Sequence, residues 1–253
     1  MSHSASSTPT LDIQGRVATI TLRRPELANR LAPEDIATFR SHLEAVNAMP
    51  QVLVLQLRGE GRFFCSGYDI ASIGNSGVSG FEDLVNAVED ARPVTITVLH
   101  GGAYGGATDI ALASDFRVGT RAVNMFMPAA KLGLHFYQRG MERYVSRLGI
   151  DAAKRLFLTG QRIDAETMLR YGVLTDLVEP EALETTVQSL TDAVSGMAPL
   201  AVLGMKKHLN QIAVGRLDLQ SLRQAIEQAA ASSDLREGTQ AWTEKRDPVF
   251  TGS

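Results

Sequence analysis

A glycine-rich turn between an apolar strand and a helix is the feature that most constrains how this chain can fold. Residues 94–99 read Val-Thr-Ile-Thr-Val-Leu, a β-branched run typical of a buried strand. Four glycines follow within residues 101–106, and residues 110–113 are apolar and compatible with a helix. We therefore predict a strand, a tight turn and a helix that begins near Gly105.

This turn has the properties of a site for developing negative charge. Glycines let the backbone approach a ligand, and the first amides of a helix have no intrahelical partners and lie at its positive end. Asp109 lies three residues beyond Gly106, on the same face of the predicted helix. The run is neither a Gly-x-Gly-x-x-Gly nor a P-loop sequence. It is either a reaction site or a packing turn without chemistry.

Composition excludes several functional classes. The net charge of −3 gives no indication of a nucleic-acid partner, and no apolar run approaches the length of a membrane span. Cys65 is the only cysteine, so no intrachain disulfide forms and the expected compartment is the cytosol. Residues 1–10 are Ser/Thr-rich without an apolar core, which predicts a disordered leader rather than a signal peptide.

Strand and helix patterns alternate along the first two thirds of the chain, and the last third is helical. Strands are predicted at 11–13 and 17–22 (a hairpin), 52–57, 94–99, 114–118 and 174–178. Helices are predicted at 33–49, 81–90, 141–148, 152–158, 165–170, 181–194, 199–214 and 217–230, with a final helix capped by Ser232. Residues 71–80 are predicted to be mobile and 125–140 irregular. The pattern indicates an α/β core over 11–195 and a helical region over 196–253.

A second informative loop, residues 59–70, follows the strand at 52–57. Loops that leave the carboxyl ends of parallel strands are where α/β folds place ligands. In this loop Cys65 has no base that can be placed beside it, so it is not expected to be a nucleophile. Asp69 is expected to brace the loop, and His100 to brace the glycine-rich turn.

Several motifs in the correct order resemble the enoyl-CoA hydratase/isomerase, or crotonase, superfamily. They are Arg24-Pro25-Glu26-Leu27-Ala28-Asn29, Phe64-Cys65-Ser66-Gly67-Tyr68-Asp69-Ile70, Gly101-Gly102-Ala103-Tyr104-Gly105-Gly106, Leu158-Thr159-Gly160 with Ala165-Glu166, Tyr171-Gly172-Val173-Leu174, and Glu237-Gly238 followed by Glu244-Lys245-Arg246-Asp247-Pro248-Val249-Phe250. The resemblance covers roughly residues 11–252. It implies a ClpP/crotonase-like spiral of β-β-α turns and a C-terminal region that forms trimers, which often pair into hexamers.

The resemblance also implies the chemistry, which is binding of an acyl-CoA thioester whose oxygen is held by two backbone amides while an enolate forms. Matched residue by residue, those donors are the amides of Tyr68 and Gly106. CoA belongs to the substrate, so neither a further cofactor nor a metal is expected. The residues expected to bind substrate are Leu27, Ser66, Gly67, Tyr68, Asp69, Ile70, Tyr104, Gly105, Pro128, Ala129, Leu134, Lys245 and Phe250. The last two come from the same subunit or from a neighbouring one.

The sequence departs from the family at both of its catalytic glutamates. Asp109 stands where the first is expected, and it is shorter by one methylene. The Pro-Glu step that carries the second is Pro128-Ala129 here, and alanine transfers no protons. We hypothesise that Asp109 and His135 transfer protons, with Tyr137 as a further candidate, because a histidine titrates near neutral pH.

The activity expected from these residues is that of an enoyl-CoA hydratase-like enzyme in fatty-acid or related acyl-CoA breakdown. Two alternatives remain. An isomerase needs only one acid–base group, because moving a double bond consumes no water. A protein that binds acyl-CoA without turnover is the other.

Overall fold

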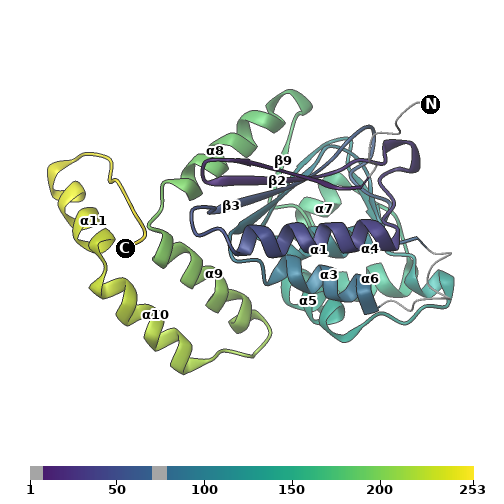
Figure 1. The fold of residues 1–253 in the computed structure, drawn as a ribbon. Coiled ribbons are helices and arrows are strands. Elements are labelled where there is room, and N and C mark those ends of the chain that lie inside the picture. Colours follow the sequence, from purple (N-terminus) through teal and green to yellow (C-terminus); the bar gives the residue numbers. More distant parts are fainter. Residues whose placement is uncertain (1–7, 70–78) are drawn as a thin grey trace.

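The computed structural model describes residues 8–69 and 79–253. Residues 1–7 of the predicted leader, residues 71–78 of the predicted mobile stretch and Ile70 lie outside these ranges. A ribbon view shows a sheet flanked by helices, with the last helices lying to one side of this body (Figure 1).

The main sheet is a hairpin continued by parallel strands. Its order is β1 (Thr10–Gln14), β2 (Val17–Leu22), β3 (Val54–Gly59), β4 (Val94–Leu99), β6 (Phe116–Thr120) and β9 (Asp176–Val178). β1 and β2 pair antiparallel, and every later pair is parallel. The predicted hairpin and the predicted strand order along the chain are confirmed.

Both faces of this sheet are covered, as the continuous apolar strands predict. Leu55 and Leu57 of β3 contribute to the core beneath α1 (Pro33–Asn47), α3 (Ser79–Glu89) and α4 (Gly106–Ala113). Ile96 and Val98 of β4 contribute to a second core with α8 (Leu183–Ser195), which lies on the opposite side of the sheet (Figure 1). Alternate residues of a strand point to opposite faces, so one apolar run serves both cores.

A small second sheet was not predicted. It joins β5 (Ala103–Tyr104), β7 (Asn124–Phe126) and β8 (Ile163–Asp164). The prediction that residues 125–140 are irregular is therefore wrong in part, because this stretch contains the end of β7, the 3-10 helix η2 (Ala129–Leu132) and the start of α5 (Gln138–Leu148). Strands this short have no readable period and form only because a partner strand is present.

The remaining helices follow the predicted order. α6 (Ile150–Thr159) and α7 (Ala165–Tyr171) lie against the body. α9 (Pro199–Ala213), α10 (Leu219–Ala231) and α11 (Ser233–Glu244) form the C-terminal region. The Ser232 side chain accepts a hydrogen bond from the Leu235 amide and caps α11, as predicted.

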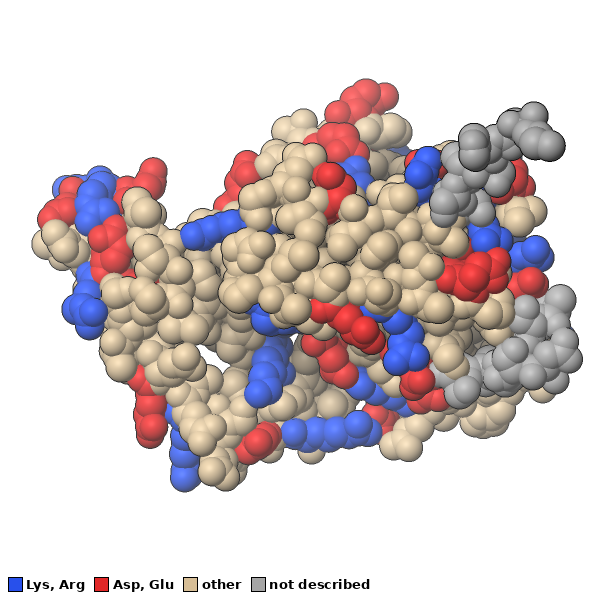
Figure 2. All heavy atoms as spheres, viewed as in Figure 1, with Lys and Arg blue, Asp and Glu red and all other residues tan. Residues whose placement is uncertain are grey.

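The surface shows no single-sign field on the face in view, because Lys and Arg are interspersed with Asp and Glu (Figure 2). Within the described ranges, none of the helices combines the length and the apolarity needed to cross a bilayer.

Candidate active site

A cavity of about 290 Å³ lies where the loops after β3 and β4 meet. Those two strands are parallel neighbours, so their carboxyl ends open on the same edge of the sheet. The described residues that line the cavity are Ser66, Tyr68, Phe81, Tyr104, Gly105, Gly106, Phe126, Met127, Pro128, Ala129, Leu132, Leu134, His135, Phe136 and Tyr137. The two glycine-bearing loops predicted from the sequence therefore do form one site.

Two backbone amides in the cavity wall are free to bind a ligand. Gly106 is the first residue of α4, where an amide has no intrahelical acceptor. Tyr68 lies in a parallel bridge with Leu31 that uses the Gly67 carbonyl and the Asp69 amide, so the Tyr68 amide points away from the bridge. No described residue accepts a hydrogen bond from either amide.

Gly67 brings these two amides together. Its φ is +92°, a conformation that side chains disfavour. A Cβ built on Gly67 would lie 2.7 Å from the Tyr104 carbonyl oxygen and 2.9 Å from the Gly106 amide nitrogen. The loop after β3 thus runs directly against the start of α4, which only glycine permits here.

Tyr137 connects the cavity to a buried carboxylate. The Tyr137 hydroxyl donates a short hydrogen bond to Oδ2 of Asp109, while its ring lines the cavity. Asp109 is 0 % exposed, and its other oxygen accepts a hydrogen bond of 2.8 Å from Nη1 of Arg143. The Asp109 carboxylate is therefore not among the lining groups. It lies behind Tyr137 and reaches the cavity only through that hydroxyl.

Arg143 holds two carboxylates inside the protein. Its guanidinium is also 0 % exposed, and it donates to Asn86 at 3.1 Å and to Glu89 at 2.9 and 3.1 Å. Burial alone would raise the pKa of Glu89, but the hydrogen bonds and charge of Arg143 lower it overall. For Asp109 burial outweighs Arg143 and Tyr137, so its pKa is raised.

The pKa of Tyr137 is raised far above its usual range. Burial is the largest cause, followed by the Asp109 charge and the hydrogen bond to it. Tyr137 therefore remains a neutral donor at physiological pH.

The other residues predicted to bind substrate or transfer protons fall into two groups, those that line the cavity and those that do not. Ser66, Tyr104, Gly105, Pro128, Ala129, Leu134 and the exposed His135 line it. The residues that do not line it are Leu27, Gly67, Asp69, Lys245 and Phe250. Ile70 lies outside the described residues.

The non-lining residues have other contacts. Leu27 contacts the site loop through its carbonyl, 3.4 Å from the Ser66 hydroxyl. Asp69 pairs with Arg30 at 3.3 Å. Phe250 lines a groove formed with α9, α10 and α11 and not the cavity of its own subunit. For Phe250 to bind substrate, it would have to reach the cavity of a neighbouring subunit.

The bracing role expected of His100 agrees with the structure. His100 Nε2 lies 2.8 Å from the Gly61 carbonyl oxygen, which ties the glycine-rich turn to the loop after β3. Cys65 is buried, and burial raises the pKa of its thiol to about 12. Such a thiol is an inert packing group at neutral pH.

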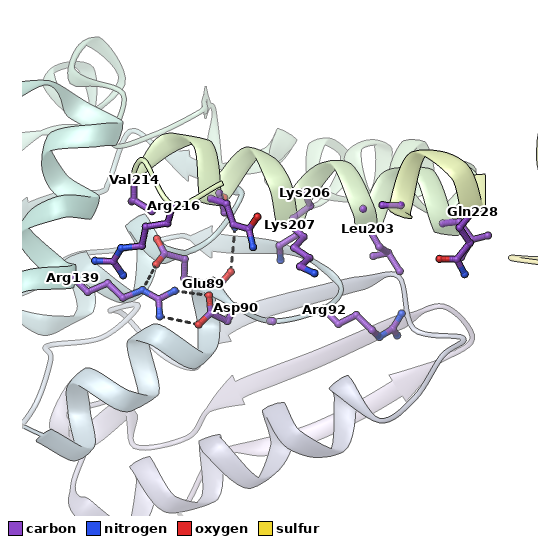
Figure 3. Close-up of a pocket in the computed structure, with 16 residues that line it drawn as sticks. Glu89, Asp90, Arg92, Arg139, Leu203, Lys206, Lys207, Val214, Arg216 and Gln228 are labelled. Atoms are coloured by element: carbon purple, nitrogen blue, oxygen red, sulfur yellow. Dashed lines mark hydrogen bonds and ion pairs between the residues drawn. The ribbon is translucent and has the colours of Figure 1, made fainter. Parts of the chain in front are cut away.

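A larger cavity of about 730 Å³ lies between the C-terminal helices and the end of α3 (Figure 3). Its basic side chains are engaged with partners inside and outside the cavity wall. Arg139 binds Glu89 at 2.8 Å and also Asp90, and Arg216 binds Glu142 at 2.8 Å. Because it contains neither free amide nor Tyr137, we place the reaction in the smaller cavity.

The sequence did not reveal Arg143, nor the aromatic and aliphatic lining supplied by Phe81, Phe126 and Phe136. The only sequence feature that could have indicated a buried Arg143 is its position beside Tyr144, between apolar positions of a predicted helix. Its buried partners come from residues 34 to 57 positions away in the chain. No local pattern shows contacts of that range.

Comparison with known proteins gives a consistent result over nearly the whole chain. The profile of the family described as enoyl-CoA hydratase/isomerase matches residues 12–253. A carnitinyl-CoA dehydratase of Citrobacter koseri is 30% identical over 94% of this chain and 96% of its own length. An (E)-benzylidenesuccinyl-CoA hydratase of Thauera aromatica is 29% identical over 96% and 99%.

The fold comparison agrees. The crystal structure of an enoyl-CoA hydratase from Bacillus anthracis superposes with a TM-score of 0.89 at 28% identity, and it covers 97% of this chain and 100% of that one. The expected crotonase fold, a mixed α/β body with mostly parallel strands, is thereby confirmed.

Proposed function

The chain belongs to the enoyl-CoA hydratase/isomerase family, and from that premise we propose that it binds an acyl-CoA thioester and adds water reversibly to a 2-enoyl group. The observation that carries the proposal is the pair of free amides at Tyr68 and Gly106, which lie in one cavity wall with Tyr137. The hydratase and dehydratase names of the relatives support a hydro-lyase.

In this proposal the thioester oxygen accepts hydrogen bonds from the amides of Tyr68 and Gly106. Negative charge develops on that oxygen as the enolate forms, and the positive end of α4 stabilises it further. One oxyanion donor is typically worth about 10²–10³ in rate. The two amides therefore supply the part of the chemistry that every reaction through a thioester enolate shares.

Tyr137 is the proposed proton-transfer group. As water adds to the β carbon, the Tyr137 oxygen takes a proton from the water while its own proton passes to Asp109. The same path in reverse delivers a proton to the α carbon of the enolate, so protons balance. Burial raises the pKa of Asp109, which makes this acceptance easier than for an exposed aspartate. Asp109 thus acts through Tyr137 and positions its hydroxyl. His135, which also lines the cavity, is the alternative donor.

Double-bond isomerisation is the second candidate, and Ala129 favours it. Ala129 lines the cavity at the position where the resemblance expects a second glutamate. A single relay through Tyr137 can remove a proton from one carbon and return it to another without water.

Mass spectrometry of CoA esters incubated with the full chain in ordinary and deuterated water tests the proposal. The panel contains a trans-2-enoyl, a 3-enoyl and a saturated ester. A gain of one water on the 2-enoyl ester is expected. Double-bond migration with deuterium uptake but no hydration would instead establish the isomerase, and binding without any product would leave an acyl-CoA-binding protein.

Tyr137→Phe removes the proposed relay hydroxyl without changing the ring. We expect kcat to fall by about 10²–10⁴, the usual contribution of a general acid–base group, with KM within a few-fold. Tyr171→Phe is the matched control, because Tyr171 is not among the described lining residues. Equal activity of the two variants would transfer the role to His135, which His135→Gln then examines.

The proposal includes assembly into homotrimers, alone or paired as hexamers. Its support is apolar surface on the C-terminal helices, where Met205, Leu209 and Ile226 are exposed and Trp242 is 87 % exposed. Light scattering on the purified chain measures the subunit number. We also propose that the protein works in the cytosol, as a single-cysteine chain suggests, and that it needs no cofactor beyond the CoA of its substrate.

A further inference from the structure

The cavity lined by Tyr68, Gly106 and Tyr137 contains a large share of the aromatic residues of this chain. The sequence contains nine Phe, five Tyr and one Trp. Six of these residues line this one cavity, and they are Tyr68, Phe81, Tyr104, Phe126, Phe136 and Tyr137. An enzyme that accepts any unbranched alkyl chain has no need to concentrate its aromatic residues in this way.

The aromatic rings form three neighbouring pairs in the wall. Phe136 and Tyr137 stack with centroids 4.4 Å apart and 22° between their planes. The centroids of Tyr104 and Phe126 are 5.0 Å apart, and those of Tyr68 and Phe81 are 5.7 Å apart. Offset and tilted pairs at these separations are favourable, and a ligand ring among them extends the same interaction.

The rest of the described wall is uncharged and the space is sufficient for a ring. No Lys, Arg, Asp or Glu is among the described lining residues; besides the six aromatic residues they are Ser66, Gly105, Gly106, Met127, Pro128, Ala129, Leu132, Leu134 and His135, of which only the exposed His135 is titratable. An apolar cavity of about 150 Å³ is known to hold benzene, so one of about 290 Å³ accommodates a phenyl ring together with the reacting carbons.

Aromatic walls bind quaternary ammonium groups as well as aromatic rings. The charged side chains around this cavity disfavour a cationic ligand. The Arg162 guanidinium carbon lies 5.0 Å from the centroids of both Tyr104 and Phe126. A cationic ligand against those two rings would therefore meet a like charge, whereas an uncharged ring would not, and the Asp109 carboxylate behind the wall is paired with Arg143.

We infer that the acyl group of the substrate carries an uncharged aromatic ring, which lies among the three aromatic pairs while the thioester oxygen meets the amides of Tyr68 and Gly106. This inference rests on the proposed acyl-CoA function and names the substrate class for it.

Calorimetric binding of saturated CoA esters tests this inference, because saturated esters bind without being hydrated. The ligands are 3-phenylpropanoyl-CoA, hexanoyl-CoA, a trimethylammonio-butanoyl-CoA and CoA itself, at one salt concentration. We expect the phenyl ester to bind about tenfold more tightly than the hexanoyl ester, from contact of its ring with more than one wall ring.

Two variants locate the effect. Phe126→Leu and, separately, Phe81→Leu should each reduce the phenyl preference by about threefold or more while changing hexanoyl binding by less than about twofold. Phe116→Leu is the matched control, because Phe116 lies at the start of β6 in the opposite core. It should leave the preference unchanged.

The outcomes separate this inference from the proposed function. Equal binding of the phenyl and hexanoyl esters, or tightest binding of the ammonium ester, would overturn the aromatic assignment while leaving an acyl-CoA enzyme. Failure of every ester to bind better than CoA would refute the acyl-CoA function and the inference with it.

Discussion

Removing Arg143 should destabilise the protein by much more than removing any nearby surface cation. Arg143 is fully buried and donates to Asp109, Glu89 and Asn86. In Arg143→Met, Glu89 keeps its 2.8 Å hydrogen bond from Arg139, whereas Asp109 keeps only the hydroxyl of Tyr137. One buried carboxylate is left without a countercharge, so the free energy of unfolding should fall by about 3–5 kcal/mol.

The assay is urea unfolding followed by circular dichroism at a fixed subunit concentration, since assembly would make stability depend on concentration. The control is Arg139→Met, one helical turn earlier on α5. Its pair with Asp90 is solvent-exposed, with Asp90 61 % exposed, and its other partner Glu89 keeps the hydrogen bonds from Arg143 in this variant, so no buried carboxylate loses its countercharge and the expected loss is about 0–1 kcal/mol.

A double variant isolates the charge. Adding Asp109→Asn to Arg143→Met replaces the stranded carboxylate by a neutral amide, and we expect it to recover about 1–3 kcal/mol of the loss. A recovery near zero would refute the reasoning, as would a loss under about 1 kcal/mol in Arg143→Met alone.

The dependence on pH gives an independent check with a definite sign. The folded-state pKa of Asp109 is already raised, and removing Arg143 raises it further. At this residue the folded state then binds more protons than the unfolded state between the ordinary aspartate pKa of about 3.9 and the raised folded-state pKa. The stability of Arg143→Met should therefore decrease as pH rises, with a larger deficit against the wild type at pH 8 than at pH 5. An equal deficit at both values would contradict this account.

Three further predictions concern the backbone and the thiol. Gly67→Ala should reduce kcat/KM at least about tenfold, because its Cβ would collide with the Gly106 amide. The control is Gly15→Ala, which should leave kcat/KM unchanged, because Gly15 also has a positive φ but has open space around it. Steady-state turnover compares the two variants. Cys65 should not react with a disulfide reagent at pH 8 until urea unfolds the chain, because its thiol pKa is about 12; reaction at once would show that the thiol is accessible. Ser232→Ala should lower the unfolding free energy by about 1 kcal/mol through loss of the α11 cap, and an unchanged urea midpoint would contradict that role.

The sequence predicted those parts of the fold that have a local cause. The strand at 94–99 and the helix after Gly105 follow from an apolar run, a glycine cluster and a change of period, and the structure has both. The Ser232 cap was readable for the same reason. By contrast β5 and β8 have two residues each, so no pattern could indicate them.

The candidate site was predicted only where two motifs converge on one sheet edge. The rule for parallel strands placed the two loops at one edge of the sheet, and the resemblance identified Tyr68 and Gly106 within them. Asp109 lies in the helix after the turn, as predicted, but its carboxylate lies behind Tyr137 and not in the cavity wall, because Tyr137 and Arg143 bind its two oxygens. Those contacts bridge 28 and 34 residues, and sequence periodicity carries no information at that range.

Strand register sets where the two loops that carry the amides begin. β3 and β4 pair Val54 with Val94 and Leu57 with Thr97, and each amide lies in the loop that follows its own strand. A slip that kept both apolar faces inward would have to move by two residues, or about 6.6 Å. Such a step is larger than the whole length of a hydrogen bond. Register therefore changes only in steps too large for the site to tolerate, so the remaining adjustment of the two donors lies in the loops, where Gly67 sets their close approach.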